Sequence, residues 1–355
     1  MPEVPDDDLF ARYPELARYS RQVRLPQLGL DGQRRLRHTS VVLVGCGALG
    51  GTLAAILVRA GLGHLRLIDR DLVELDNLQR QILFDEQDVS EHLPKAAAAA
   101  RKLRRANSAV EVEAVVADLG PRNARALCAD ADLLLDGTDN LETRYLINDI
   151  AVQANVPWVY GACVGVEGLV LTIIPGQTPC LRCLWEEPPP PGSLPTCDTA
   201  GVLATAAGVV ASFQATEALK LLAGRAAALH GRLLAIDVWA GRVRAVNVQA
   251  AYEPGRCVCC GQRRYEFLDG TRASATTTLC GRNAVQVLPP EGTAVDLRAL
   301  GRRLPASARA KGNDFLLRFQ ADAYTVTLFA DGRAIVHGTA DAAVARSVVA
   351  KFVGV

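Results

Sequence analysis

The chain has 355 residues, 50% of them hydrophobic, which suffices for one large domain and a smaller one. Its 39 Lys and Arg nearly balance 38 Asp and Glu, so charge gives no indication of a nucleic-acid or membrane-surface partner. Residues 1–8 lack an apolar signal core, and no apolar run reaches the roughly 18 residues that a membrane span needs. We therefore expect a cytoplasmic protein, in which ten cysteines indicate metal or thiol chemistry rather than disulfides.

Residues 1–38 are expected to form a helical N-terminal arm. Apolar residues recur in it at helical spacing, at Leu9, Tyr13, Leu16 and Tyr19. Arg21 follows them and has two interpretations: a solvated surface charge, or a charge that the arm delivers to a site. A short helix over 31–38 is expected before the first strand.

A glycine-rich turn between a strand and a helix is the most informative stretch. Residues 41–44 predict a buried strand, and residues 52–60 predict a helix with an apolar face. Between them Gly45, Gly47 and Gly50 have G-x-G-x-x-G spacing, which allows a tight turn near a phosphate and close packing of the helix. The helix N-terminus also favours a phosphate. The stretch predicts a nucleotide site; the alternative is a tight turn without a ligand.

The following strands and helices alternate. A strand over 64–69 ends in Asp69, about twenty residues after the glycines, where a ribose-binding carboxylate is expected. Further strands are expected at 110–117, 132–136 and 158–162, and helices at 95–106, 122–129 and 141–155. This alternation predicts an α/β fold, a doubly wound, Rossmann-like sheet that is mainly parallel.

The pattern changes after residue 165. A strand at 166–174, a Pro-rich loop at 187–195, a helix at 202–223 and a hairpin over 232–249 are expected next. Residues 265–355 then indicate a separate small α+β domain with a three- or four-stranded sheet. Its strands are expected at 284–288, 314–320, 324–330 and 333–337, and its helices at 295–303 and 340–352.

Two cysteine pairs, Cys180/Cys183 and Cys257/Cys260, have the C-x-x-C spacing of zinc knuckles. Each pair can hold one edge of a tetrahedral ion, so together they predict a four-thiolate zinc site that joins distant segments. Such a site has no open position and is structural rather than catalytic. The alternative is two unrelated thiol pairs, and Cys259 could replace either member of the second pair.

Three charged residues, Arg80, Lys95 and Asp139, are expected in loops at one edge of the sheet. Two cations and one acid suit a triphosphate with Mg²⁺ better than a dinucleotide, because cations neutralise phosphate charge while a carboxylate holds the metal. Arg21 is a further candidate for this group. Each charge taken singly could equally belong to an ordinary surface.

The chain resembles the ThiF/MoeB/HesA family of E1-like adenylyltransferases over about residues 15–262. The resemblance rests on motifs that occur in the family's order: Arg18-Tyr19-Ser20-Arg21-Gln22, the glycine loop, Asp76-Asn77-Leu78-Gln79-Arg80-Gln81, Pro94-Lys95, Asp136-Gly137-Thr138-Asp139-Asn140, the cysteine pairs and Thr196-Cys197. It implies an ATP-binding adenylation domain over 39–264 with the zinc site. It also implies a homodimer that adenylates the C-terminal Gly-Gly carboxylate of a small β-grasp sulfur-carrier protein, similar to ThiS or MoaD.

The resemblance also assigns residues. It implies that ATP is bound by Gly45, Gly47, Ala48, Gly50, Asp69 (on the ribose), Asn77, Gln79, Arg80, Lys95, Asp139 (through Mg²⁺) and Asn140. Arg21 would reach the neighbouring subunit's site. Many relatives have Gly where this chain has Ala48, a mild departure that should not block ATP.

Cys197 is the candidate for covalent chemistry. In the family this position resembles a cysteine that can take the activated carrier as a thioester or acyl-disulfide; the alternative is an idle loop cysteine. Many relatives carry a C-terminal rhodanese domain with a persulfide cysteine. Here the last cysteine, Cys280, precedes most of the C-terminal domain, so we expect no working rhodanese, and a structural role for Cys280 rather than sulfur handling.

Two other function classes compete with adenylation. One is an NAD-dependent oxidoreductase, which would not need Arg80, Lys95 and Asp139. The other is a non-catalytic module that uses the same scaffold to hold a β-grasp protein. The sequence leaves open which pathway is served (thiamine, molybdopterin or tRNA thiolation) and which sulfur donor is used, a cysteine desulfurase or a rhodanese.

Overall fold

The computed structural model describes residues 10–189, 193, 197–253, 255–272, 276–279, 283–289 and 293–353, without the side chains of 197, 198 and 276–279. The chain divides into two compact units, Met1–Thr271 and Arg272–Val355. Residues 265–271, which follow the boundary expected from the sequence, pack in the first unit, where Phe267 and Leu268 are buried. No helix among the described residues is long and apolar enough to cross a membrane.

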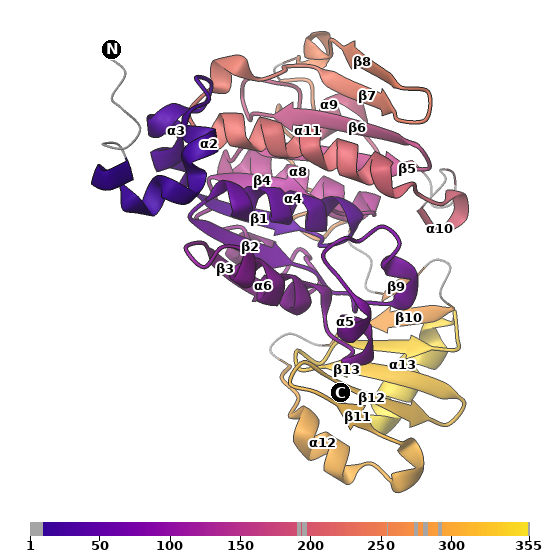
Figure 1. Ribbon diagram of the computed structural model, residues 1–355. Coiled ribbons are helices and arrows are strands. Elements are labelled where there is room, and N and C mark those ends of the chain that lie inside the picture. The colour runs from indigo at the N-terminus through magenta and orange to yellow at the C-terminus, as the bar shows by residue number, and fades with distance from the viewer. Residues whose placement is uncertain are drawn as a thin grey trace. The chain divides into compact units, whose positions relative to one another are not determined.

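The first unit is built on an eight-stranded sheet with the order β3-β2-β1-β4-β5-β6-β7-β8 (Figure 1). Its strands are β1 (Ser40–Val44), β2 (His64–Ile68), β3 (Glu111–Val115), β4 (Leu133–Asp136), β5 (Trp158–Val164), β6 (Glu167–Ile173), β7 (Leu233–Asp237) and β8 (Arg242–Val246). The strands from β3 to β5 pair in parallel, and those from β5 to β8 pair antiparallel. The expected doubly wound α/β fold is therefore confirmed, with the carboxyl ends of the parallel strands at one common edge.

Helices connect these strands. The α-helices of the first unit are α2 (Ser20–Val23), α3 (Gly29–Leu36), α4 (Ala48–Ala60), α5 (Glu86–Ser90), α6 (Lys95–Ala106), α7 (Ala124–Leu127), α8 (Leu141–Ala154), α9 (Leu181–Leu184), α10 (Cys197–Ala200) and α11 (Ala204–Leu222). Short 3-10 helices include η1 (Pro14–Tyr19), η2 (Leu75–Asn77), η3 (Ala226–Ala228) and η4 (Gln249–Ala251). The arm expected over residues 1–38 contains η1, α2 and α3.

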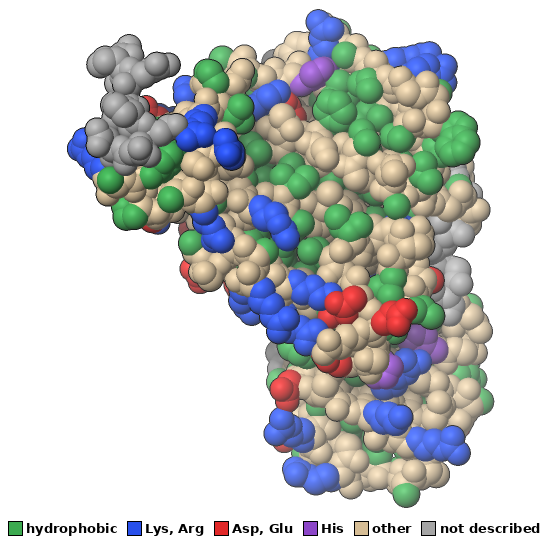
Figure 2. Space-filling view, viewed as in Figure 1, with side chains coloured by type: hydrophobic (Ala, Val, Ile, Leu, Met, Phe, Trp, Pro, Cys, Tyr) green, Lys and Arg blue, Asp and Glu red, His purple; other side chains and the backbone are tan. Residues whose placement is uncertain are grey.

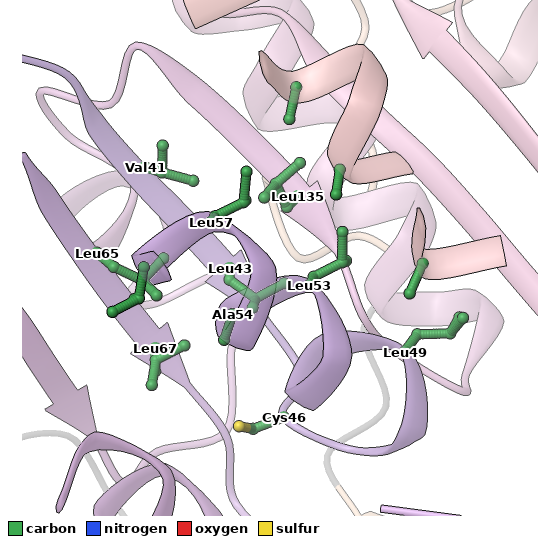
Figure 3. Close-up of a cluster of buried hydrophobic side chains, with 14 of the residues drawn as sticks. Val41, Leu43, Cys46, Leu49, Leu53, Ala54, Leu57, Leu65, Leu67 and Leu135 are labelled. Carbon is green, nitrogen blue, oxygen red and sulfur yellow. The ribbon is translucent and has the colours of Figure 1, made fainter. Parts of the chain in front are cut away.

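Alternate residues of β1 face two separate apolar layers. Val41 and Leu43 pack with α4, α6 and α11 on one face, the cluster drawn in Figure 3. Val42 and Val44 pack on the other face with residues of α8 such as Ile147. A strand that is buried on both faces explains the unbroken β-branched and Leu run in this part of the sequence.

The second unit has a six-stranded antiparallel sheet with the order β11-β12-β13-β14-β10-β9. Its elements are β9 (Thr276–Leu279), β10 (Ala284–Val287), α12 (Leu297–Arg303), η5 (Ala306–Ala308), β11 (Lys311–Gly312), β12 (Leu316–Ala321), β13 (Tyr324–Phe329), β14 (Ala334–His337) and α13 (Ala342–Phe352). The expectation of three or four strands was too low. Strands β9, which is rich in Thr, and β11, which has two residues, were not predicted, because neither alternates apolar with polar residues.

Candidate functional site

The glycine loop between β1 and α4 is fixed by close backbone packing. Gly45 has a φ of +87°, and a Cβ there would lie 2.5 Å from the carbonyl oxygen of Gly137. A Cβ on Gly50 would lie 1.9 Å from the carbonyl oxygen of Gly45. A side chain at Gly45 would therefore force the loop after β1 away from the loop after β4, and one at Gly50 would force the first turn of α4 away from the loop after β1. Around Gly47, by contrast, a Cβ would meet only Gln81 Nε2, at 3.7 Å, so the backbone there is accessible to a ligand.

Asp69 joins the loop after β2 to the glycine loop. Its Oδ2 accepts a hydrogen bond from the backbone N–H of Cys46 at 2.6 Å, and its Oδ1 accepts one from the N–H of Asp71 at 2.7 Å. Burial raises the pKa of Asp69, and the positive charge of Lys95 opposes that shift. Two backbone donors thus hold this carboxylate beside the start of α4, with acceptor capacity left on both oxygens.

Lys95, the first residue of α6, reaches the same place. Its Nζ lies 3.1 Å from Asp71 Oδ2, and the residue is 5% exposed. Burial lowers the pKa of Lys95, but the charges of Asp71, Asp69 and Asp139 outweigh it and raise the pKa above its ordinary value. The ammonium group therefore stays charged at neutral pH, as a cation that neutralises phosphate must.

The loop from Asp136 to Asn140 carries the candidate metal ligand. Asp139 is exposed and stands two residues after Gly137, whose carbonyl oxygen packs against Gly45; its charge also raises the pKa of Lys95. Asn140 caps α8, because its side-chain oxygen accepts a hydrogen bond from the N–H of Thr143 at 2.8 Å. The structure thus gives Asn140 a helix-capping contact beside Asp139.

Two buried side chains that the sequence analysis missed hold this loop. Arg144 Nε pairs with Asp136 Oδ2 at 3.1 Å, and Arg144 Nη2 donates to the carbonyl oxygen of Thr138 at 2.7 Å. Gln214 Nε2, from α11, donates to the carbonyl oxygen of Asp136 at 2.8 Å. The available signal was one charged and one amide side chain within stretches predicted to form helices that pack on the sheet. Their contacts fix the backbone on which Asp139 stands.

In the segment from η2 to Gln81, some side chains for which the motif predicts nucleotide contacts make hydrogen bonds within the segment itself. Asn77 is buried, and its Oδ1 accepts from the N–H of Glu74 at 3.2 Å, so its side chain is used within the turn. Gln79 is exposed and Arg80 half-buried, with Arg80 Nη1 donating to the carbonyl oxygen of Asp76 at 2.8 Å. Gln81, another residue that the analysis missed, is buried with its amide next to Gly47.

Arg21 is not brought to this edge in the same chain. It is exposed on α2, and the next residue, Gln22, donates to the carbonyl oxygen of Ala60 at 3.0 Å, at the last residue of α4. The glycine loop lies at the other end of α4, about 20 Å away for a helix of 13 residues. Arg21 therefore lies at the opposite edge of the sheet from the glycine loop of its own chain.

The four cysteines of the two knuckle pairs come together on the α8 side of the sheet. Their Sγ atoms all lie within 4.8 Å of one another, with separations such as 3.6 Å for Cys180–Cys257 and 3.4 Å for Cys183–Cys260. Tetrahedral zinc with bonds of about 2.3 Å needs sulfur atoms about 3.8 Å apart, so the donor set fits this ion. Cys259 lies outside the group of four, and its Sγ accepts a hydrogen bond from Asn148 Nδ2 at 3.3 Å.

Comparisons with known proteins agree with this arrangement. The sequence pattern of the ThiF family matches residues 19–259. The chain belongs to the ThiF family. It is 43% identical to the sulfur carrier protein ThiS adenylyltransferase of Bacillus subtilis over 338 residues, 95% of this chain and 99% of that protein. It is 42% identical to the sulfur carrier protein adenylyltransferase of Thermus thermophilus over 252 residues, 70% of this chain and 91% of that protein.

A solved structure of Escherichia coli MccB in complex with MccA-N7isoASN has the same fold, with a TM-score of 0.60 and 22% identity. That match covers 73% of this chain and 83% of the MccB chain. The alignment with the Bacillus ThiF-family relative, which spans 95% of this chain, includes most of Arg272–Val355. The second unit is therefore a feature that this chain shares with that relative.

The candidate sulfur-handling cysteines of this ThiF-family chain are only partly described. Cys197 begins α10, and its side chain lies outside the described atoms, as does the whole of Cys280. The backbone after α10 is fixed at the end of β5, where the N–H of Gly165 donates to the carbonyl oxygen of Gly201 at 2.9 Å. Helix α10, which begins at Cys197, is therefore followed directly by a residue that contacts the sheet at the carboxyl end of β5.

Proposed function

We propose that this protein catalyses the ATP-dependent adenylation of the C-terminal Gly-Gly carboxylate of a small β-grasp sulfur-carrier protein, with release of pyrophosphate. The observation that carries the proposal is the joint presence of Asp69, Lys95 and Asp139 around the glycine loop in a ThiF-family chain. An oxidoreductase of the NAD-dependent class has no comparable need for the last two. A purely binding module has no need for a buried, permanently charged lysine beside the nucleotide loop.

The reaction requires alignment and charge neutralisation more than proton transfer. A carboxylate is already ionised and nucleophilic near pH 7, so the carrier's terminus can attack the α-phosphorus of ATP directly. The α-phosphorus–oxygen bond to pyrophosphate breaks as the acyl-adenylate forms. Lys95 and Arg80 are the proposed cations that offset the negative charge on the phosphates.

The remaining nucleotide contacts follow from the site. Asp69 binds the ribose hydroxyls through its free acceptor capacity, while Gly45, Gly47, Ala48 and Gly50 bring backbone N–H groups and the α4 N-terminus to the phosphates. Gln79 lies within reach as an exposed polar side chain, whereas Asn77 and Asn140 act mainly by shaping their loops. Asp139 is the proposed Mg²⁺ ligand; this ion would offset charge on the phosphate oxygens.

Arg21 acts, in this proposal, on the site of a second copy of the chain in a homodimer. Its place at the far edge of the sheet supports this, because its side chain cannot span α4 to the glycine loop of its own chain. The guanidinium group would approach the triphosphate of the partner and add a positive charge there.

The cysteine cluster is proposed to hold one Zn²⁺ through Cys180, Cys183, Cys257 and Cys260. Four thiolates leave no coordination position for a substrate, so the ion supplies folding energy rather than chemistry. Asn148 supports this role from α8: its Oδ1 accepts from the N–H of Leu181 at 2.8 Å, while its Nδ2 donates to the Sγ of Cys259 at 3.3 Å.

Cys197 remains a proposal for the step after adenylation, as the thiol that accepts the activated carrier. The acyl carbon would pass from the adenylate to sulfur, with AMP as the leaving group. A cysteine desulfurase or a rhodanese is the expected sulfur donor downstream. Among carriers, a ThiS-like protein is favoured, because the Bacillus relative that shares both units is named for ThiS.

The test is ATP–pyrophosphate exchange with radiolabelled pyrophosphate and a panel of purified carriers of ThiS-like and MoaD-like sequence. Exchange with one carrier supports the proposal and identifies the pathway. A carrier lacking its last glycine is the matched control and should give no exchange. Absence of exchange with every carrier, from protein that binds ATP, would favour a non-catalytic carrier-binding module instead.

A further inference from the structure

The N-terminal arm is firmly attached at the edge of the sheet opposite the nucleotide site. Helices α4, α6 and α11 run back from the carboxyl edge, so their C-terminal ends lie together there (Figure 1). The arm packs on these ends: Arg225, just after α11, donates through Nε to the carbonyl oxygen of Gln27 at 3.1 Å. Figure 2 shows Lys and Arg side chains on the surface of the arm.

Tyr19 is inserted at the end of α4. It is 4% exposed, and a Cβ on Gly61 would lie 2.4 Å from its ring carbon Cζ, so only glycine leaves room for the ring. The Tyr19 hydroxyl accepts a hydrogen bond from Asn107 Nδ2 at 2.7 Å. Asn107 is the C-cap residue of α6, and the same Nδ2 also donates to the carbonyl oxygen of Val58 at 2.7 Å. One amide thus ties the arm to two helices at once.

A second contact lies three residues further along. Gln22 Nε2 donates to Gln33 Oε1 at 2.9 Å and to the carbonyl oxygen of Ala60 at 3.0 Å. Gln33, from α3, is fully buried and donates to the same carbonyl oxygen at 2.8 Å. We call Tyr19, Gln22, Gln33 and Asn107 together the arm anchor.

Arg21 lies between the two halves of the arm anchor. Tyr19 and Gln22 are held on either side of it, so its backbone is fixed, yet its own side chain is exposed. The anchored residues carry no net charge and lie about 20 Å from the glycine loop of their own chain. These contacts fix the backbone that carries Arg21, at the edge of the sheet away from the chain's own glycine loop.

We propose that Tyr19 and Asn107 are positioning residues for the partner subunit's active site, because they fix the arm from which Arg21 is delivered. This inference rests on the proposed action of Arg21 in a second copy. Its distinctive consequence is that a change at Asn107, at the end of α6 in the body of one chain, impairs adenylation in the other chain. Misplacement of a charged group by about 1 Å can cost about 100-fold in rate, so we expect that loss of kcat with little change in the KM for ATP.

The test uses heterodimers of two variants, co-expressed with different affinity tags, purified through both tags and assayed by pyrophosphate exchange. The reference pair is Arg21→Ala with Asp139→Ala, each inactive as a homodimer. The heterodimer has one site with an intact Asp139 that faces an intact Arg21, so about half of the wild-type exchange should return. Failure of this reference pair overturns the delivery of Arg21 between chains, and this inference with it.

Tyr19→Ala is then paired with each reference variant. If Tyr19 positions the arm, the pair with Asp139→Ala recovers about half of the exchange and the pair with Arg21→Ala recovers almost none. If Tyr19 acts on its own chain's site, the two results are reversed, which overturns the inference while leaving the proposed function intact. Asn107→Leu, which removes both Nδ2 hydrogen bonds and has a similar volume, should follow the pattern of Tyr19→Ala.

Controls separate positioning from misfolding. Tyr19→Phe loses the hydrogen bond from Asn107 but keeps the ring beside Gly61, so its exchange should lie between that of the wild type and that of Tyr19→Ala. Gln27→Ala changes an exposed arm side chain outside the arm anchor and should have no effect. Limited trypsin digestion should cleave the arm of Tyr19→Ala at least about tenfold faster than the wild-type arm, because local detachment exposes its arginines. An arm that stays equally resistant in that variant would contradict the anchoring role.

Discussion

Two sites in the first unit differ in how open they are. Around the glycine loop, Asp139 and Gln79 are exposed and Lys95 is buried, and the buried side chains of Arg144 and Gln214 hold the backbone beneath Asp139. In the cysteine cluster four Sγ atoms lie within 4.8 Å of one another and leave no gap for a substrate. The first arrangement suits molecules that enter and leave, and the second suits one ion that stays.

The contrast teaches that activity and stability are largely separate in this unit. Removing the exposed charge of Asp139 should alter the reaction but not the fold, because the loop beneath is held by Arg144 and Gln214 rather than by that charge. Removing one proposed ligand from the closed site should weaken zinc binding and, with it, the link between segments far apart in sequence. The following predictions test how complete this separation is.

Asp139→Ala should have the largest effect. We expect pyrophosphate exchange to fall by at least about 1,000-fold, because the proposed metal ligand is lost, while the melting temperature changes by less than about 2 °C. Exchange and thermal unfolding are measured on the same preparation. Asp139→Asn, which keeps the shape without the charge, should be almost as inactive; exchange at the wild-type rate in either variant refutes the role of Asp139.

Cys183→Ser should show the opposite behaviour. It removes one of four proposed zinc ligands, so we expect loss of bound zinc and a melting temperature lower by about 10 °C or more. Metal content by atomic emission and thermal unfolding provide the measurements. Cys128→Ala, a buried cysteine outside the cluster, should keep its zinc; an unchanged metal content in Cys183→Ser would remove this residue from the site.

Lys95→Met should reduce both activity and stability, because Lys95 is a proposed phosphate-binding cation and is also buried in an ion pair with Asp71. We expect exchange to fall by about 100-fold, through lost phosphate neutralisation, and the free energy of unfolding to fall by about 3 kcal/mol, since Asp69 and Asp71 lose their partner. Urea unfolding and exchange kinetics measure the two effects. Lys95→Arg retains the charge and should recover much of the stability; a Met variant as stable as wild type would show that the pair with Asp71 contributes little.

Asp149→Asn should affect only the pH dependence of stability. Burial raises the pKa of Asp149 to about 6, although the N–H groups of Phe267 and Leu268 and the charge of Arg182 oppose the shift. Between the ordinary carboxyl pKa near 4 and this value the folded state binds more protons than the unfolded state. The free energy of unfolding therefore decreases as pH rises from about 4 to 6, by up to about 3 kcal/mol from this group.

Urea unfolding of wild type and Asp149→Asn at pH 4.5 and pH 7.0 measures this effect. The difference in unfolding free energy between the two proteins should grow in favour of the variant at the higher pH. Exchange activity should be unchanged at both. An equal difference at the two pH values would mean that Asp149 is ionised in both the folded and unfolded states.

The main sheet could be predicted from the sequence because its signals are local. The unbroken apolar run at 41–44 predicts the strand β1, and the glycine spacing after it predicts the turn. The hairpin of β7 and β8 is predicted by the alternation on either side of Ala240-Gly241. The second unit was predicted less completely, because β11 has only two residues. A strand of that length is stabilised by its pairing with β12 and leaves no periodicity to detect.

Candidate site residues could be predicted where a sequence motif marks them. Residues whose role depends on tertiary packing could not. Asp69 and Lys95 were proposed from their distance to the glycines and their motif, and the structure brings them together through Asp71. Arg144 and Gln214 were not found, since their role depends on where α8 and α11 pack. The pairing of Tyr19 with Gly61 could not be predicted for the same reason: they are 42 positions apart, and only the fold brings them into contact.

The cysteine cluster has a consequence for the protein in the cell. A ligand that binds only the folded state stabilises it by mass action, and each tenfold rise in free ligand above the dissociation constant adds about 1.4 kcal/mol. In the proposed zinc-bound form, the cluster joins Cys180 and Cys183 to Cys257 and Cys260 at the end of the first unit. The amount of folded enzyme would then follow the zinc supply of the cell, so zinc starvation would reduce sulfur-carrier activation through protein turnover without altering the active site.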